Sequence, residues 1–488
     1  MPAPTHRARS PWVAVGVILV GSYAALLNIT VVGVALPAIV NDLGTSGGPG
    51  VDWVVTAFLI GVVAVQPLTG WAADRVGRKR VYGASLIVFA LGSLLCAVAP
   101  GMTLLVAARV VQGAGAGAVM PIGMATVYDL FPPERRGTAM GVWGVAVMAA
   151  PAVGPPVGGW MVTAASWRLL FVVFGVIAVA AAVLSVRYLP DVGHRERRPL
   201  DLIGWVLSVV GVVAIVIVSR ELPSWGVTSP VTLLVAGVGV GAIVAVVLRS
   251  LSHPHPIIEF RMFAVPAFAA GMVVVWLSST NQFGQLTFLP VELQVVRDLD
   301  PGRVGLLLAP AALGVAATMP LGGWLVDRVG ARVPVFVGLA VMAIGTFQLA
   351  GLRPDGSELS LVIVLIVIGV GQGFVFVPTT VAAMSSLSDR FVAQASVVNS
   401  LNRQLSGAVG VAVFSAIVVA ELGAVAPLDV DVDRAQAAYN RVFLVSAWTC
   451  VAGLVACLWL PGRRRMQEHH RDRSAERTGD EPAESRLS

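Results

Sequence analysis

Charge is scarce in this chain of 488 residues, of which 12% are charged and 57% are hydrophobic. Soluble domains carry about 25% charged residues, so this composition cannot cover a soluble surface of the same size. Apolar runs of roughly 20 residues, long enough to cross the hydrocarbon core of a bilayer, follow one another along most of the chain. The composition therefore excludes a soluble protein and predicts an all-α membrane protein surrounded by the lipid bilayer.

The chain also lacks the residue patterns that several kinds of chemistry require. Its three cysteines, Cys96, Cys450 and Cys457, lie in no metal-ligand spacing, and we expect neither a metal site nor a disulfide framework. There is no G-x-x-x-x-G-K-[ST] segment, which argues against ATP-driven transport. No Ser/His/Asp set stands out, so we expect no enzyme activity and no cofactor.

Lysine is nearly absent, since Lys79 is the only one, and the net charge of +6 comes from arginines between apolar runs. This distribution argues against a nucleic-acid partner. Basic residues concentrate in the cytoplasmic loops of membrane proteins. All arginine clusters fall on one side of an even number of spans, so both termini are expected in the cytoplasm. The abundance of Ala, Gly, Val and Pro is typical of a GC-rich genome, and we expect a multi-pass protein of a bacterial plasma membrane.

Fourteen apolar runs predict fourteen transmembrane helices, arranged as two six-helix bundles and a two-helix insertion of plain Val, Leu, Ile and Gly runs. The runs lie near residues 12–38, 53–73, 81–99, 103–128, 138–162, 167–189, 202–219, 229–250, 266–293, 303–325, 332–351, 359–384, 394–420 and 440–460. The predicted divisions are a cytoplasmic N-terminus (1–11), an N-terminal bundle (12–190), the insertion (191–262), a C-terminal bundle (263–461) and a disordered cytoplasmic tail (462–488). We expect a functional monomer.

A charged segment after the second run recurs about 253 residues later, with Pro, Leu, Gly, Trp, Asp, Arg, Val and Gly in the same order. Asn28 and Asn281 have the same offset, which indicates a duplicated membrane protein. The first copy holds Gly70, Asp74, Arg75, Gly77, Arg78 and Lys79; the second holds Gly323, Asp327, Arg328 and Gly330.

We expect each copy to form a tight loop. The charge of Asp74 could cap the N-terminus of a neighbouring helix. The first copy is expected to be the main latch that holds the cytoplasmic side closed. The second copy is expected to be a weaker latch, because Ala331 stands where the first copy has Arg78.

Charge at the centre of a bilayer costs about 2.5–3.5 kcal/mol on insertion scales, so polar residues within spans call for an explanation. Arg109 and Gln112 lie one helical turn apart on one face of the fourth run. Asn402 and Arg403 belong to a polar stripe on the thirteenth run. The alternatives are an arginine that snorkels to the outer interface for Arg109 and a hydrogen-bonded packing seam for the stripe.

The ninth run has a polar centre, in which Asn281 and Gln285 share a face and Trp276 lies just before them. Amide and aromatic groups suit a site for a large amphipathic ligand, whereas polar packing against the first run is the alternative. The residues expected to line a substrate cavity or couple transport are Asn28, Arg109, Gln112, Trp276, Asn281, Gln285, Asn402 and Arg403. Asp129 and Glu292, both near span ends, are the acids that could couple protons.

These motifs resemble the Major Facilitator Superfamily, and within it the fourteen-helix drug–proton antiporter family. The segment 70–80 looks like the superfamily's cytoplasmic-loop motif. Arg109-x-x-Gln112-Gly113 looks like the span-four motif, whose arginine the family links to proton transfer. The run Gly154-Pro155-x-x-Gly158-Gly159 looks like the span-five motif of exporters, and its prolines predict a bent helix with a bare glycine face.

One position departs from the family pattern. Where the family has Leu-Asp-x-Thr in the first span, this chain has Leu27-Asn28-Ile29-Thr30. An amide cannot titrate, so the alternatives are that proton coupling uses Asp129 or another acid, or that the proton stoichiometry is lower.

The resemblance implies a secondary active exporter of hydrophobic or cationic drug-like compounds that works by alternating access and uses the proton gradient. Export of one endogenous metabolite, antibiotic or lipid is the second reading of the sequence. A membrane sensor or scaffold that transports nothing is the third.

Overall fold

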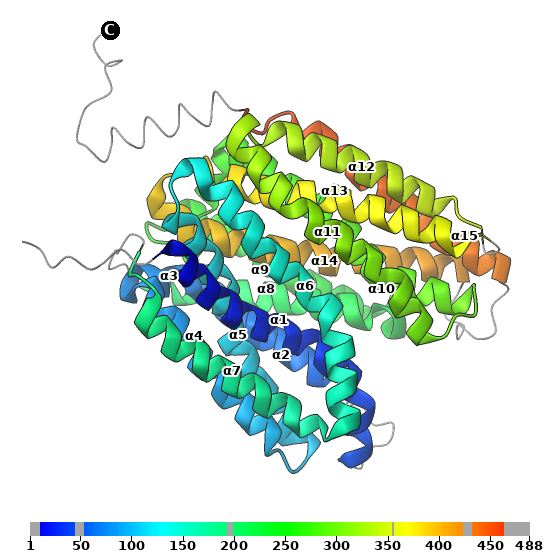
Figure 1. The fold of residues 1–488 in the computed structure, drawn as a ribbon, viewed down its shortest axis with the longest axis horizontal. Coiled ribbons are helices and arrows are strands. Elements are labelled where there is room, and N and C mark those ends of the chain that lie inside the picture. The colour runs from blue at the N-terminus through cyan, green and yellow to red at the C-terminus, as the bar shows by residue number, and fades with distance from the viewer. Residues whose placement is uncertain (1–9, 44–52, 193–198, 354–355, 423–431, 463–488) are drawn as a thin grey trace, which may run out of the picture. The chain divides into compact units, whose positions relative to one another are not determined.

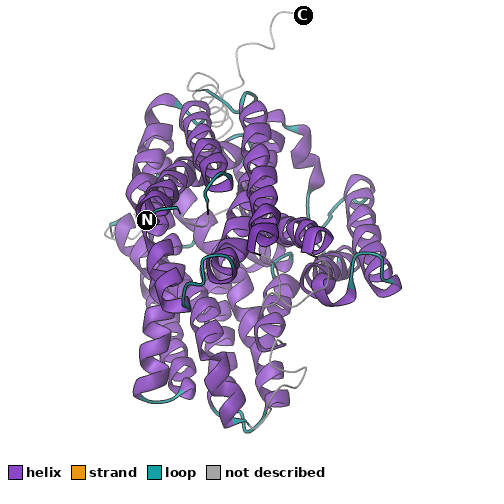
Figure 2. Cartoon of the chain, turned by 90° about the vertical axis from the view of Figure 1, so that its right-hand side faces the viewer, coloured by secondary structure: helices purple, strands orange, loops and turns teal. Residues whose placement is uncertain are grey.

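The computed structural model describes residues 10–43, 53–192, 199–353, 356–422 and 432–462. Within these ranges the chain is built of helices joined by short loops (Figure 2), and the β-pairing there is one isolated antiparallel bridge between Gly330 and Gly462. The predicted disordered tail lies outside the described residues except for Gly462. The predicted N-terminal cytoplasmic segment lies outside them up to residue 9.

The helices follow one another in the order labelled in Figure 1. They are α1 (Pro11–Asp42), α2 (Trp53–Val65), α3 (Leu68–Val76), α4 (Arg78–Ala97), α5 (Met102–Leu130), α6 (Arg136–Ala164), α7 (Trp167–Tyr188), α8 (Leu202–Trp225), α9 (Pro230–Ser252), α10 (Pro266–Val295), α11 (Pro301–Val329), α12 (Arg332–Ala350), α13 (Glu358–Ser385), α14 (Val392–Leu422) and α15 (Val432–Cys457), with short 3-10 helices at Pro133–Arg135, Phe260–Ala264 and Asp389–Phe391.

Every predicted span overlaps a helix, so the all-α membrane architecture is confirmed. In the described ranges, eleven helices are long and apolar enough to cross a membrane, or twelve if α2 and α3, which meet at a bend of 49°, form one span. Helices α6 and α10, of 29 and 30 residues, lie outside that number. The count of fourteen spans and the two-helix insertion therefore stay predictions.

Contacts divide the chain into two compact units. Unit 1 comprises residues 1–132 and 149–198, and unit 2 comprises residues 133–148 and 199–488. The N-terminal part of α6 therefore belongs to unit 2 and its C-terminal part to unit 1. The predicted domain boundaries stay predictions.

The core of unit 1 depends on glycines of α5 that let α2 and α4 approach its backbone. A Cβ added to Gly113 would lie 2.0 Å from the carbonyl oxygen of Phe58 on α2, and one added to Gly115 would lie 2.2 Å from the backbone nitrogen of Phe89 on α4. Small residues at helix crossings are the usual means of close packing in membranes. This packing brings the polar side chains of α1, α4 and α5 together.

In unit 2, α10 packs on α14 and α15, while α13 packs on α11 and α12. One apolar cluster includes Phe288 and Leu293 of α10, Ile368 of α13, Phe414 of α14 and Phe443 of α15. Helix α8 packs on α9 and α14. The start of α8 is capped by Asp201, which accepts hydrogen bonds from the backbone of Gly204 and from Arg249 of α9. Burial raises the pKa of Asp201, but these hydrogen bonds outweigh it and leave that pKa below its usual value.

Each repeated segment was predicted to be a loop, but most of it is helical. Helix α3 runs through Asp74 and Arg75 to Val76, and α11 runs through Asp327 to Val329. Only a glycine breaks each helix, Gly77 with φ 99° and Gly330 with φ 84°. Ala and Arg favour helix, and the left-handed backbone that ends it suits glycine.

Candidate transport and coupling sites

Arg109 of α5 lies at the centre of a buried polar network in unit 1. It donates hydrogen bonds to the Oδ1 atom of Asn28 on α1, to the Oε1 atom of Gln112 and, at 2.9 Å from Nε, to the carbonyl oxygen of Val54 on α2. Gln112 in turn donates to the Oγ atom of Ser93 on α4 at 2.7 Å. Four helices are thus tied together by three side chains that the sequence singled out.

The guanidinium of Arg109 is also held by aromatic rings. Its Cζ atom lies 4.3 Å from the ring centroid of Phe58 and 5.9 Å from that of Phe171. Because the side chain of Arg109 is 0% exposed, the alternative of an arginine snorkelling to the interface is excluded. The hydrogen bond between Arg109 and Gln112 confirms that the two side chains share a face of α5, and their role in transport stays a prediction.

Asn281 of α10 anchors a second buried network, in unit 2. Its Nδ2 atom donates to Ser446 of α15 and to Thr346 of α12, at 2.9 Å and 3.2 Å from the hydroxyl oxygens. Its Oδ1 atom accepts a hydrogen bond from Gln285, one turn along α10, at 2.8 Å. The shared face of Asn281 and Gln285 is therefore confirmed. The partners of Asn281 on other helices belong to α12 and α15, whereas the alternative that the sequence left open was polar packing against the first run. Trp276 is half-buried.

The polar stripe on α14 faces α10 within unit 2. Arg403 donates to the Oε1 atom of Gln282 at 3.0 Å and lies 4.1 Å over the ring of Phe376. Asn402 donates to the carbonyl oxygen of Met272 at 2.9 Å. Both stripe residues are half-buried, so they keep some surface while they join the two helices.

The first copy of the repeated segment is held by an ion pair. Arg78 donates to the carboxylate of Asp129, at the end of α5, at 2.5 Å, and to the carbonyl oxygen of Ala125 at 2.8 Å. Asp129 thus has a structural partner, and its coupling role stays a prediction. Lys79 follows Arg78 at the start of α4 and is half-buried. Gly70 is buried in α3.

Asp327 of the second copy caps a neighbouring helix, whereas the capping role expected of Asp74 in the first copy stays a prediction. Asp327 accepts hydrogen bonds from the backbone nitrogens of Gly137 and Thr138, at 2.8 Å and 2.9 Å, and from the Thr138 hydroxyl at 2.8 Å. These are orphan donors at the N-terminus of α6. A Cβ added to Gly323 would lie 2.1 Å from the carbonyl oxygen of Gly137. The second copy is therefore a full capping site. Asp74 is buried.

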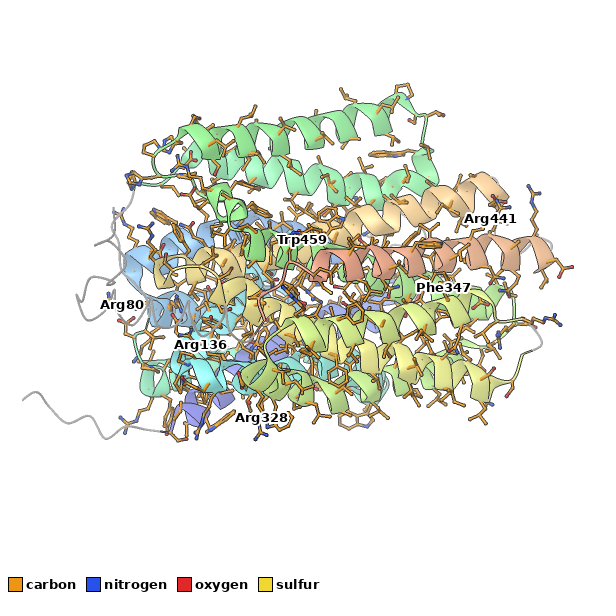
Figure 3. All side chains as sticks on the ribbon, turned by 90° about the horizontal axis from the view of Figure 1, so that it is seen from above. Arg80, Arg136, Arg328, Phe347, Arg441 and Trp459 are labelled. Atoms are coloured by element: carbon orange, nitrogen blue, oxygen red, sulfur yellow. The ribbon has the colours of Figure 1, made fainter. Side chains whose placement is uncertain are left out.

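Arginines lie at both ends of the helices of unit 2, as Arg303 and Arg328 do at the start and the end of α11. Figure 3 shows Arg136 and Arg328 at the end opposite to Arg441. Arg328 lies 4.1 Å over the ring of Trp324, and Arg75 of unit 1 lies 5.5 Å over the ring of Trp71. Arginine and tryptophan four residues apart thus recur in both copies, and both pairs suit an interface between membrane and water.

The exporter-type segment of α6 presents bare glycines to α1 in unit 1. A Cβ added to Gly154 would lie 2.0 Å from the hydroxyl oxygen of Thr30, and one added to Gly158 would lie 2.8 Å from Val31. The predicted close glycine face is therefore present. Gly159 lies beside it with a looser neighbour, Val34, at 3.9 Å. The side chain of Pro155 falls outside the described residues.

Glu292 lies near the end of α10, as predicted, but its side chain is buried rather than interfacial, with 4% exposed. Phe288 and Leu293 of the apolar cluster flank it along the same helix. A carboxyl group in such surroundings is stable only when protonated or paired. In the described ranges, no group of three or more His, Cys, Asp and Glu side chains could hold a metal ion.

The sequence reasoning missed two hydroxyl residues of these networks. Ser93 supports Gln112 in unit 1, and Thr346 supports Asn281 in unit 2. The two have the same offset of about 253 residues as Asn28 and Asn281. Extending the repeat comparison from the first span to the third would have found them.

Fold and buried networks define a multi-span helical membrane transporter. The family model of the Major Facilitator Superfamily matches residues 18–411. The Multidrug resistance protein B homolog of Mycobacterium tuberculosis (strain ATCC 25618 / H37Rv) is 33% identical over 406 residues, which cover 82% of this chain and 75% of that protein. The Multidrug export protein EmrB of Haemophilus influenzae is 30% identical over 397 residues, which cover 80% and 77% of the two chains. The chain belongs to the Major Facilitator Superfamily.

A solved structure shares the fold. The crystal structure of the human organic anion transporter MFSD10 (TETRAN) matches with a TM-score of 0.63 and 17% sequence identity, covering 91% of this chain and 100% of that chain. The family resemblance that the motifs indicated is therefore confirmed by both sequence and fold.

Proposed function

We propose that this protein is a secondary active exporter of drug-like hydrophobic or cationic compounds, driven by inward proton flow across a bacterial plasma membrane. The observation that carries the proposal is the tight packing of Gly154 and Gly158 of α6 against Thr30 and Val31 of α1, in the segment that resembles the exporter motif. The names of relatives, multidrug resistance and multidrug export proteins, support it. The exporter works as a monomer, without a cofactor and with both termini in the cytoplasm.

Alternating access requires parts of the protein to change their packing around a central substrate. Four of the predicted cavity residues are half-buried: Trp276, Gln285, Asn402 and Arg403. In this proposal they supply aromatic and hydrogen-bonding surface to a ligand. Asn28, Arg109 and Asn281 are fully buried. In this proposal they set the spacing of the helices around the cavity.

Glu292 is the stronger of the two proposed coupling acids. Asp129 is engaged in an ion pair with Arg78. Glu292 is buried beside the apolar cluster of unit 2, where gain and loss of a proton change the free energy of burial most. In this proposal, the carboxyl group of Glu292 takes the role of the coupling carboxylate that the family has at the position of Asn28.

The proposal is tested by dye efflux from loaded cells that express the chain. Expression should speed the efflux of a hydrophobic cationic dye, and a protonophore should abolish this gain because it removes the driving force. Cells with the empty vector give the background rate. Efflux that stays equally fast after the gradient is dissipated would contradict proton-driven transport, and no gain for any compound in a broad panel would contradict drug export.

A further inference from the structure

Two buried N–H donors of the Arg109 network have no acceptor. The Nη2 atom of Arg109 and the Nδ2 atom of Asn28 make no hydrogen bond with any part of the described chain. Both side chains are 0% exposed. A buried donor without an acceptor costs about 1–3 kcal/mol, and more when the group is charged.

The two donors belong to one pair of groups. Arg109 Nη1 donates to Asn28 Oδ1, so the guanidinium and the amide share a hydrogen bond, and each unfilled nitrogen is attached to the same carbon as one of the two bonding atoms. This bond also fixes the orientation of the amide, since its oxygen must face Arg109. The pair thus offers donors only.

The positive charge of Arg109 is not balanced within this network. Its hydrogen-bond partners are an amide of α1, an amide of α5 and a backbone carbonyl of α2, all of them neutral. No carboxylate forms an ion pair with Arg109 in the described ranges. A buried cation without a counter-charge is costly, so an anion at this place would be stabilised strongly.

The equivalent position in unit 2 differs. The Nδ2 atom of Asn281 has the hydroxyl groups of Thr346 and Ser446 as acceptors, and its Oδ1 atom accepts from Gln285. The offset of the repeat places Val362 where unit 1 has Arg109. The equivalent position of unit 2 therefore has neither the unfilled amide donor nor the arginine charge.

We propose that Arg109 Nη2 and Asn28 Nδ2 form a binding site for a small monovalent anion, either a halide ion from solution or the carboxylate of a transported organic acid. The surroundings limit the size of the anion, because the guanidinium is enclosed by Phe58 and Phe171 and by the backbone of α2. The anion supplies the negative charge that an aspartate at position 28 would supply. The inference does not depend on drug export, because anion binding is measured without transport.

The test is the thermal unfolding of the purified protein in detergent at constant ionic strength. Sodium gluconate, whose many hydroxyl groups oppose entry into a site enclosed by aromatic rings, is replaced stepwise by sodium chloride or bromide in one series and by sodium acetate in another. A bound anion stabilises the folded state by mass action, so we expect a saturable rise in Tm of about 2–4 °C. A rise with halides only identifies the ion from solution, and a rise with carboxylates only identifies an organic acid. A Tm that responds to neither series overturns the proposal.

Asn28→Asp provides the matched variant. Its carboxylate can accept from Arg109 in place of the amide and balance the charge, so its Tm in gluconate should equal or exceed that of the wild type in chloride, with no further anion response. Asn281→Asp, the same change at the equivalent position of unit 2, should keep the wild-type anion response. If Asn28→Asp responds to anions as the wild type does, the anion binds elsewhere and the proposal fails.

Anomalous scattering from bromide locates the ion independently of stability. A crystal grown in sodium bromide should show a peak within hydrogen-bonding distance of Arg109 Nη2. Bromide peaks confined to other places would contradict the assignment.

Discussion

Compared with the aspartate of the family pattern, Asn28 changes the chemistry of α1 but still accepts a hydrogen bond from Arg109. Its amide oxygen accepts from Arg109, as a carboxylate at the same position could, but it brings no charge and no titrating proton. The family pattern has a carboxylate at this position, so in the proposed proton-driven exporter another acid would carry the proton. Among the two acids that the sequence proposed, Asp129 has Arg78 as its partner and Glu292 is buried near apolar residues.

We predict that Glu292→Gln removes the response to a pH gradient. The amide keeps the size of the side chain but cannot carry a proton, so gradient-driven uptake into everted vesicles should fall at least about ten-fold, the effect of losing roughly 1.4 kcal/mol or more of coupling. Exchange of labelled for unlabelled substrate, which needs no proton, should continue. Uptake that follows the gradient as in the wild type would exclude Glu292.

Asp129→Asn is the comparison variant for that experiment. It breaks the ion pair with Arg78, which is 3% exposed, and leaves a buried charge without its partner. We expect it to lower the Tm of the purified protein while transport that remains still responds to the gradient. Loss of the gradient response together with an unchanged Tm would instead assign coupling to Asp129.

At the scale of helices, the repeated segments act through their ends. Asp327 near the end of α11 caps α6, while Arg78 at the start of α4 binds the end of α5. The sequence predicted both segments from their charge and their repetition. It could not predict these partners, because Asp327 and Gly137 are far apart in the chain and only the tertiary fold brings them together. The charged segment of α3 was expected to be a loop, but Ala and Arg favour a helix there.

We predict that Asp327→Asn weakens the cap of α6. The amide oxygen can still accept one hydrogen bond, but the negative charge that suits a helix N-terminus is lost, at a cost of about 0.5–2 kcal/mol. The Tm should therefore fall and transport should slow, while the amount of protein in the membrane stays the same. Arg328→Gln, which alters an exposed neighbour on the same helix, is the matched control. A wild-type Tm for Asp327→Asn would remove the capping argument.

At the scale of the whole molecule, apolar run length and the positions of arginine predicted the helices closely. Helix α12 was expected at 332–351 and runs from Arg332 to Ala350. Errors occur at polar ends, as at α15, which begins at Val432 and not near residue 440. The first turn of that helix carries Asp433 and Arg434, so hydropathy gives no signal there. The faces of Asn281 and Gln285 were also predictable from helical spacing, whereas the helices that they contact were not.

We predict that labelling from the two sides of the membrane separates the two ends of unit 2. The native residues Cys96, Cys450 and Cys457 are buried, so the wild type should react little with a membrane-impermeant maleimide. Arg441→Cys should react in intact cells, because the predicted orientation places the Arg328 end in the cytoplasm and Arg441 lies at the other end (Figure 3). Arg328→Cys should react only in everted vesicles. Labelling of Arg328→Cys in intact cells would reverse the predicted orientation.

The ion pair between Arg78 and Asp129 has a consequence for the history of the duplication. The offset of the repeat places Ala331 and Ala382 at the equivalent positions in the second half, so both partners differ there together. An intermediate ancestor with only one of the two would have carried a lone charge at a mostly buried site. A single charge there is more costly than both charges together or neither. Selection therefore favours sequences with both charges or with neither. Introducing the pair into the second half should leave the protein stably folded only when Ala331→Arg and Ala382→Asp are made together.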